Sequence, residues 1–378
     1  MNKVATFLKN LPLSADEIAL KSRLSAERIH AFLDGEDPSL ADLRALARGL
    51  KVPLRSFSSE NSNDSELGLL FRQTVASRPD RGVDSASSFV QAAIELLPER
   101  TAPLEWLSDF QFEQESYEDA ARLANEFRER FTPNRPDEPL IDLPKIITDL
   151  GVILGRLETS RFEGASVIVG GYPFVFVSPR FSGRMLFTLA HEIGHLITHH
   201  KWTGGNAVSF DLAGQIGNGR HYKSQSESFV NAFASVLLMP TRGIGIALKE
   251  IRKTLKIEAA AIGDVEILYV SRIYGVSFEV AARRCEDLEL LPIGGARSLT
   301  QYLRDNFGGP EKRASALRIP PRPIVEIPRV SHNLLEIASE KVNQGAVSIG
   351  WVTDRLNCTI NDIYGSRVSP ERPRGPHH

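Results

Sequence analysis

The chain has 378 residues and a formal net charge of −2, with 42% hydrophobic and 24% charged residues. This composition is typical of folded globular proteins and excludes collagen-like and wholly disordered chains, and the length fits two or three domains. The two cysteines, Cys285 and Cys358, have no CxxC partner, which excludes a disulfide scaffold, a cysteine-type zinc finger and an iron–sulfur cluster. Because we find no signal-peptide core and no run of 18 apolar residues, we expect a cytoplasmic protein without membrane contact.

Residues 1–57 are predicted to form three short helices joined by tight turns. Ser14, Ser25 and Ser39 each precede a helical pattern, as N-capping residues do. The segment resembles the Xre/Cro-type helix-turn-helix family over residues 13–57, including the stretch 34–43 that ends one helix and starts the next. The resemblance implies a recognition helix at Ser25–Leu33.

That recognition helix would contact duplex DNA through Ser25, Arg28 and His30. Only Arg28 suits a guanine edge well. Residues 1–57 hold 9 basic and 7 acidic residues, and four of the acidic side chains would repel phosphate: Glu27, Asp34, Glu36 and Asp37. A module for protein contact or dimerisation therefore stays open beside DNA binding, and a homodimer is expected for tight DNA binding.

Residues 58–114 are predicted to be a helical linker region that begins with the polar run 58–66. Over residues 58–131 the chain carries 15 acidic and 7 basic residues, which argues against DNA contact there. Apolar residues recur at helical spacing up to Phe131, which predicts a helix with one packed face.

Residues 115–291 are predicted to form one domain with a small sheet. β-Branched runs at 152–157, 165–169 and 173–177 predict three strands. Two long apolar helices follow, one through residues 184–200 and one through 226–239, with a glycine-rich loop at 202–219 between them.

Residues 292–330 contain six prolines and are predicted to be an extended connector, and residues 331–365 return to a helical pattern. Two helix pairs, at 270–291 and 334–365, are expected to be packing units, with a DNA role as the alternative. The fold class expected is α+β and mostly helical: a helix-turn-helix bundle, a zincin-like domain with a small sheet, and a helical C-terminal region.

The strongest chemical signal is the run His191-Glu192-Ile193-Gly194-His195 inside an apolar helix. Residues i and i+4 lie on one helix face, so both imidazoles can reach one Zn²⁺ at about 2.0–2.1 Å while Glu192 points at the water on it. The alternative is that both histidines are core residues whose ring nitrogens are hydrogen-bonded and bind no metal.

A catalytic zinc has three protein ligands and one open position. The candidates for the third ligand are Glu227, His199, His200 and His221. His199 and His200 extend the same helix and cannot easily close a tetrahedron around the ion, so we favour Glu227 from the second helix. A first-turn glutamate that complements the helix dipole is the alternative for Glu227.

The sequence FTLAHEIGHLITHH at 187–200, followed by E-x-x-x-N-A-F-A-x-x-L-L-M-P at 227–240, resembles the ImmA/IrrE family of metallopeptidases. The resemblance covers roughly residues 115–290. It implies that His191, His195 and Glu227 bind zinc and that Glu192 is the general base. Family members commonly carry Glu-x-Glu-Ala-Asn, whereas this chain has Phe229 and Val230 at the third and fourth of these positions.

A zinc site of this kind is expected to catalyse peptide hydrolysis. Glu192 would transfer the proton of the attacking water to the leaving amine. We expect the substrate to add as a strand along a sheet edge near 165–169 or 175–177. The candidate oxyanion donors are Tyr172, His221 and Tyr222.

The leading hypothesis is a zinc-dependent endopeptidase coupled to a helix-turn-helix module. Members of the family cleave Xre-type repressors, so the resemblance implies such a repressor as the protein substrate, cleaved in a stress or mobile-element response. The alternative is a DNA-binding transcription regulator whose metallopeptidase-like domain is a sensor without turnover. An intact Glu192, which binds no metal, favours catalysis.

Overall fold

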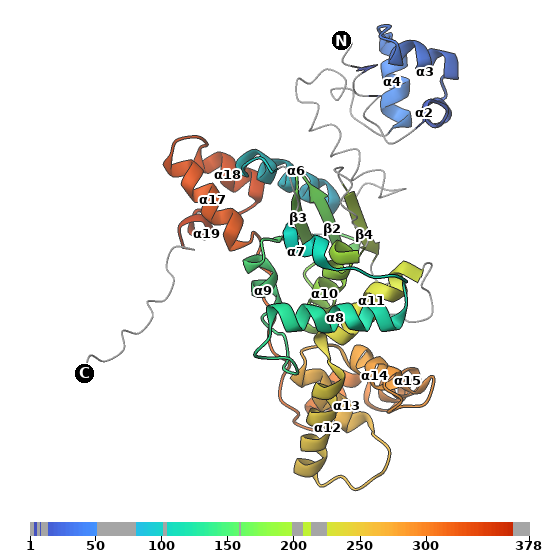
Figure 1. The fold of residues 1–378 in the computed structure, drawn as a ribbon, viewed down its shortest axis with the longest axis vertical. Coiled ribbons are helices and arrows are strands. Elements are labelled where there is room, and N and C mark those ends of the chain that lie inside the picture. Colours follow the sequence, from blue (N-terminus) through green and yellow to red (C-terminus); the bar gives the residue numbers. More distant parts are fainter. Residues whose placement is uncertain are drawn as a thin grey trace, which may run out of the picture.

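The computed structural model describes residues 4–5, 8, 14–50, 81–100, 104–158, 160–198, 207–212 and 225–365. This part of the chain is mostly helical and contains one four-stranded sheet, in agreement with the predicted α+β class. Figure 1 shows the sheet near the middle of the molecule, with helices on both of its faces.

The described residues of the N-terminal module include the helices α2 (Ala15–Ser22), α3 (Ala26–Leu33) and α4 (Leu40–Gly49), and residues 4, 5 and 8 are helical as well. The side chains of Ser14, Ser25 and Ser39 accept hydrogen bonds from the backbone N–H groups of residues 17, 28 and 42, which confirms the predicted caps. The helices bury a core of their own, made by Val4, Leu8, Ile18, Ala19, Ile29, Phe32, Leu46 and Leu50.

The sheet has the strand order β1-β3-β2-β4, with β1 (Ile153–Arg156), β2 (Phe162–Val169), β3 (Tyr172–Val177) and β4 (Ala207–Leu212). β1 runs parallel to β3, and the other pairs are antiparallel. The three predicted strands are confirmed. β4 lies in the stretch that was interpreted as a glycine-rich loop, so that interpretation is wrong: the short run AVSFDL pairs with β2 despite its glycine-rich surroundings.

The prediction that a substrate strand adds along 165–169 or 175–177 is also wrong, because neither segment lies at an edge of the sheet. β2 is covered by β4, and β3 lies between β1 and β2. The segment 317–330 runs along β1, where Gly155 bridges Val330 and the Ser331 N–H donates to the Leu154 carbonyl at 3.1 Å. In the described part of the chain, β4 is thus the outer strand that pairs on one side alone.

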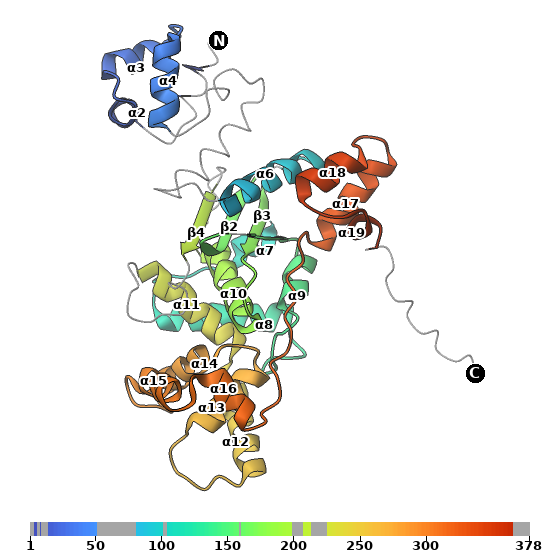
Figure 2. The same ribbon diagram turned by 180° about the vertical axis from the view of Figure 1, so that it is seen from behind.

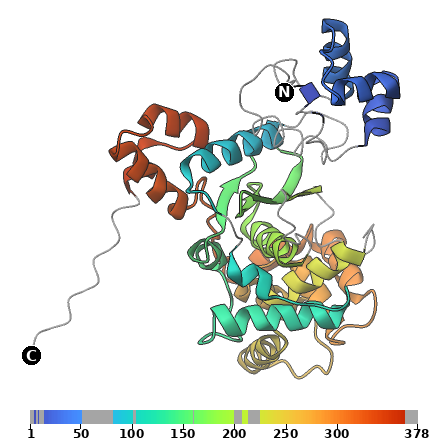
Figure 3. The same ribbon diagram turned by 45° about the horizontal axis from the view of Figure 1, so that its top comes forward.

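Side chains alternate between the two faces of the sheet and separate two cores. Val175, Val177 and Ile168 pack toward α10 (Ser182–Thr198). The opposite face, with Phe174 and Phe176, packs against helices from both ends of the chain, namely α6 (Arg81–Leu96), α17 (His332–Asn343), α18 (Ile349–Leu356) and α19 (Ile360–Gly365). Figure 3 shows the sheet between α6 and α10. The sheet therefore separates the helix with the HExxH run from the C-terminal helices.

The larger core surrounds α10 and is made by the remaining helices. They are α7 (Glu105–Asp109), α8 (Tyr117–Phe131), α9 (Leu143–Asp149), α11 (Gln225–Leu238), α12 (Thr241–Leu255), α13 (Asp264–Ile273), α14 (Phe278–Asp287), α15 (Gly295–Phe307) and α16 (Pro310–Ala316). Figure 2 shows α11 beside α8 and α10, with α12 to α16 below them.

The prediction of an extended connector at 292–330 is wrong over the first half of this segment. Residues there form α15 (Gly295–Phe307) and α16 (Pro310–Ala316), and only 317–330 is extended. Pro310 occupies a first-turn position of its helix, and Gly308 ends the preceding helix with a φ of 70°. Proline and glycine are favoured at these two places, so here they mark helix ends.

The two helix-turn-helix-like pairs are packing units, as expected. Phe278, Arg284 and Cys285 of α14 are buried in the core around α10. In the C-terminal pair, Val352 and Leu356 of α18 pack against α6 and the sheet. Both pairs therefore pack into the protein core through one helix face.

No single helix among the described residues has the length and apolar character needed to cross a membrane. The pair α11 and α12 meets those criteria together, but it is bent by 50°.

Two fully buried arginines bind the C-terminal end of α11. Arg128 donates from Nε to the Leu237 carbonyl at 2.7 Å, and its terminal nitrogens donate to the carbonyls of residues 135, 136 and 138. Arg284 donates to the Met239 carbonyl at 3.0 Å, to Thr241 Oγ1 and to the Tyr117 hydroxyl. Burial lowers the pKa of Arg128 to about 10, so the side chain stays cationic at neutral pH and stabilises this negative helix end.

Arg128→Ala should lower the free energy of unfolding by about 3–5 kcal/mol, because it leaves several buried carbonyls without donors. Arg122→Ala on the same helix is the control: its half-exposed side chain pairs with Asp119 and Glu126, and its loss should cost within about 1 kcal/mol. Urea unfolding of both variants measures the difference, and equal midpoints would contradict the assigned role of Arg128.

Candidate metal centre

The helix α10 places His191, Glu192 and His195 inside the protein. His191 and Glu192 are fully buried and His195 is 3% exposed. The HExxH run occupies the second half of the helix, and every residue from 186 to 198 is buried, so this part of the helix is enclosed on all sides. Buried polar side chains are costly unless they are hydrogen-bonded or bind a metal, so these three side chains need polar partners inside the core.

The helix α11 supplies Glu227 from its first turn. Gly194 lets the two helices approach closely, since a Cβ atom there would lie 3.1 Å from Phe233 Cδ1 and 3.2 Å from Val230 Cβ. Both contacts are on α11, less than two turns beyond Glu227. The absent side chain of Gly194 therefore helps to bring Glu227 to the histidines.

Three ligand atoms converge between the helices. His191 Nε2 and His195 Nε2 lie 3.1 Å apart, and the Glu227 carboxylate oxygens lie 3.5 Å from each of them. Metal–ligand distances of about 2.0–2.1 Å in a tetrahedron require ligand atoms about 3.3–3.4 Å apart. The two imidazole nitrogens and the Glu227 carboxylate, which turns a different oxygen to each histidine, thus suit one tetrahedral ion with one further position, and Glu227, 30% exposed, is the ligand nearest to solvent.

The structure therefore brings together the three predicted metal ligands. The other candidates for the third ligand, His199, His200 and His221, lie outside the described residues. Asn231 donates from Nδ2 to the Glu227 backbone carbonyl at 2.7 Å, one turn along the helix.

The carboxylate of Glu192 lies against the backbone of β2. A Cβ atom at Gly164 would lie 2.1 Å from Glu192 Oε1 and 2.7 Å from Thr188 Cγ2. Gly164 lies at a bulge in the pairing of β2 with β4, where the strand bends locally. Only glycine leaves room for the carboxylate, so β2 limits where Glu192 can point.

Beside Glu192, the same helix face carries an ion pair that the sequence did not predict. Arg184 donates from Nε to Glu163 Oε2 at 2.8 Å, and Glu163 is buried. Arg184, Thr188 and Glu192 follow one another at four-residue spacing and so lie on one face of α10. No sequence pattern pointed to a role for Glu163 or Gly164, because their roles depend on the register of β2.

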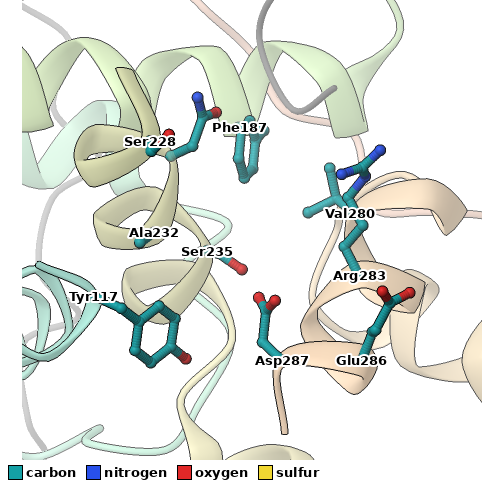
Figure 4. A pocket seen from close by; sticks show the side chains of 10 residues that line it. Tyr117, Phe187, Ser228, Ala232, Ser235, Val280, Arg283, Glu286 and Asp287 are labelled. Atoms are coloured by element: carbon teal, nitrogen blue, oxygen red, sulfur yellow. The ribbon is translucent and has the colours of Figure 1, made fainter. Parts of the chain in front are cut away.

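A polar pocket of about 290 Å³ opens next to the metal ligands. It is lined by Phe187, one turn before His191, and by Asn231, one turn after Glu227. Figure 4 shows Tyr117 and the α11 side chains Ser228 and Ser235 on one side, and the α14 side chains Val280, Arg283, Glu286 and Asp287 on the other. The carboxylate of Glu286 accepts hydrogen bonds from the N–H groups of Gly294 and Ala296. Among the described residues at this wall, Asp287 is the carboxylate that accepts no hydrogen bond from a backbone N–H group.

The structure does not bring the predicted oxyanion donor Tyr172 to the metal centre. Its ring belongs to the core on the sheet face opposite α10, and its hydroxyl donates to the Pro98 carbonyl at 2.9 Å. His221 and Tyr222 lie outside the described residues.

The three residues predicted to contact DNA have different surroundings. The Ser25 hydroxyl accepts the Arg28 N–H as a helix cap, and His30 is exposed. The Arg28 guanidinium pairs with Glu36 and with Asp42 and lies over the Phe32 ring. Hydrogen bonds to Glu36 and Asp42 raise the pKa of Arg28. The side chain best suited to read a base is therefore held by two carboxylates of its own module.

Residues 148–286 match the peptidase M78 family model described as the IrrE N-terminal-like domain. The matched stretch contains His191, Glu192, His195 and Glu227, and it supports the resemblance to the ImmA/IrrE family for this part of the chain. A comparison with curated proteins finds no match.

Glu227→Ala should sharply reduce the metal content per chain, because two histidines alone leave the ion with too few protein ligands. Metal analysis after dialysis measures the occupancy, and Ser228→Ala on the same turn of α11 is the control that should keep it. Full occupancy in Glu227→Ala would instead assign the third ligand to His199, His200 or His221.

Proposed function

We propose that the metallopeptidase-like domain of this chain is a zinc-dependent endopeptidase that cleaves a regulatory protein. The observation that carries the proposal is the combination of three converging ligand atoms with a buried Glu192 on the adjacent helix position. A site that merely held a metal would not need Glu192.

Zinc, when bound, supplies a Lewis acid that lowers the pKa of a water molecule and polarises the scissile carbonyl. Glu192 accepts a proton from the attacking water and passes it to the leaving nitrogen, so a C–O bond forms and the peptide C–N bond breaks. The close contact with Gly164 limits the movement of the carboxylate during this transfer.

The substrate is proposed to be an Xre-type repressor, cleaved in the cytoplasm in a stress or mobile-element response. An extended peptide that adds to the sheet has β4 as the outer strand to pair with in the described part of the chain. The pocket between α11 and α14 lies one helical turn from two of the ligands, where a substrate side chain would be held.

The second candidate function is a DNA-binding regulator whose metal domain senses a signal without turnover. The separate core of the N-terminal module favours a self-contained binding unit. Its cation best suited to DNA is already paired with Glu36 and Asp42, which favours the use of this module for protein contact.

Metal-loaded protein should cut a repressor encoded beside its gene into discrete fragments, and Glu192→Gln should abolish this while keeping the metal. General bases contribute about 10²–10⁴-fold to such rates. Mass spectrometry of the fragments and metal analysis of the variant are the two measurements. Unchanged turnover in Glu192→Gln would rule out the assigned mechanism.

Gly164→Ala provides a second variant, which leaves Glu192 and the three metal ligands unchanged. The new methyl group displaces the Glu192 carboxylate, so turnover should fall by about tenfold or more while metal content stays unchanged. Gly245→Ala is the matched control, since a Cβ atom at Gly245 has nothing within 4 Å.

Deletion of residues 1–57 separates the two candidate functions. If the module recognises a protein, the deletion should raise KM for the repressor and leave metal content and the cleavage of a short unstructured peptide intact. If the module binds DNA, the full chain should shift the anisotropy of an operator duplex in a salt-dependent way, and the deletion should abolish the shift while KM stays the same.

A further inference from the structure

Three arginines without carboxylate partners line one narrow cavity. Arg156 lies at the end of β1, Arg329 on the extended segment and Arg355 on α18, and all three line a cavity of about 20 Å³. In the described part of the chain, none of the three forms an ion pair with a carboxylate. Other arginines do so, among them Arg130, Arg135, Arg272 and Arg313.

A larger cavity of about 610 Å³ adjoins the narrow one, because Arg156 and Arg329 line both. The Arg156 Nε donates to the Ile327 carbonyl at 2.6 Å, which fixes this guanidinium at the boundary of the two cavities. The wall of the larger cavity also has a cationic side chain, Lys145, which pairs with Asp149, and apolar parts from Pro144, Pro328, Val330 and Leu335.

Three acidic side chains, Glu158, Glu326 and Asp362, also line these walls, but none of them forms an ion pair with the three arginines among the described residues. The Asp362 carboxylate accepts hydrogen bonds from the Thr359 N–H at 2.7 Å and from Thr359 Oγ1 at 2.8 Å. These bonds lower the pKa of Asp362, and the charge of Arg329 adds to the effect. Glu326 is exposed, and Glu158 lines the narrow cavity without an ion pair to its arginines.

Arginines that share a cavity repel one another, and a phosphate group between them would relieve that repulsion. Guanidinium groups match the oxygens of a phosphate in a planar, bidentate geometry. A volume of about 610 Å³ falls within the range of pockets for small ligands, about 300–1,000 Å³. We propose that the larger cavity is a binding site for a small phosphate-bearing molecule of mononucleotide size, with its phosphate at Arg156 and Arg329, which line both cavities, and with Arg355 behind them in the narrow one.

This site is distinct from the metal centre but belongs to the same sheet. Arg156 pairs with Val177, and Val177 pairs with Gly164, against which Glu192 packs. The cavities lie between β1, α9 and the C-terminal helices, so a ligand there would contact residues inside and outside the matched stretch 148–286.

The test is calorimetric titration of the full chain, freed of metal so that phosphate cannot bind an ion, with AMP in 0.15 M salt. We expect saturable binding that weakens at least tenfold in the double variant Arg329→Ala/Arg355→Ala. Both side chains are exposed, so the variant should keep the thermal midpoint of the parent. Arg297→Ala on α15, also an exposed arginine, is the matched control and should bind AMP as the parent does.

Hydrogen exchange with and without AMP locates the ligand. Slower exchange is expected in peptides that cover residues 153–158, 326–335 and 349–358. Absence of binding, equal affinity in the double variant, or protection confined to other parts of the chain would each overturn the proposal. Inorganic phosphate titrated in parallel shows whether the phosphate group alone suffices, and a weaker affinity than that of AMP is expected.

Discussion

The close approach of α10 and α11 at Gly194 is the constraint on which the metal centre depends. His191 and His195 are placed by one helix, whereas Glu227 has to come from another, and its oxygens reach both imidazoles at 3.5 Å. A side chain at position 194 would meet Val230 and Phe233, so α11 or these side chains would have to shift by a few tenths of an ångström. Because the ligand separations already match a tetrahedral ion, a displacement of α11 would move Glu227 away from that geometry.

The opposite end of α11 is held by a different kind of interaction. Arg128 and Arg284 come from helices before and after α11 in the sequence, and their guanidinium groups bind the carbonyls of Leu237 and Met239. These cations satisfy acceptors that a helix end otherwise leaves open. A helix fixed at its C-terminal end by hydrogen bonds and along its length by packing at Gly194 has little freedom to rotate. The direction of Glu227 is therefore set by contacts remote from the metal.

Local features of this protein were predictable and long-range ones were not. The caps at Ser14, Ser25 and Ser39 and the face shared by His191 and His195 follow from spacing within a few residues. Glu227 could be proposed because the geometry of zinc requires a second helix. The sheet edge was mispredicted because strand order depends on β4, and Pro310 and Gly308 were interpreted as loop residues because their value as helix ends appears only with the helices.

The charges of the N-terminal module bear on how the whole chain is used. Arg28 is the base-reading candidate of α3, yet it lies between Glu36 and Asp42, and Asp42 also serves as the capping-box residue of Ser39. Moving Arg28 to a guanine edge would leave both carboxylates facing the phosphates of the duplex, so the gain from one contact would be offset by repulsion. A protein surface with cationic groups would meet the same carboxylates favourably. The electrostatics of this module therefore agree better with recognition of a protein substrate than with tight binding to DNA.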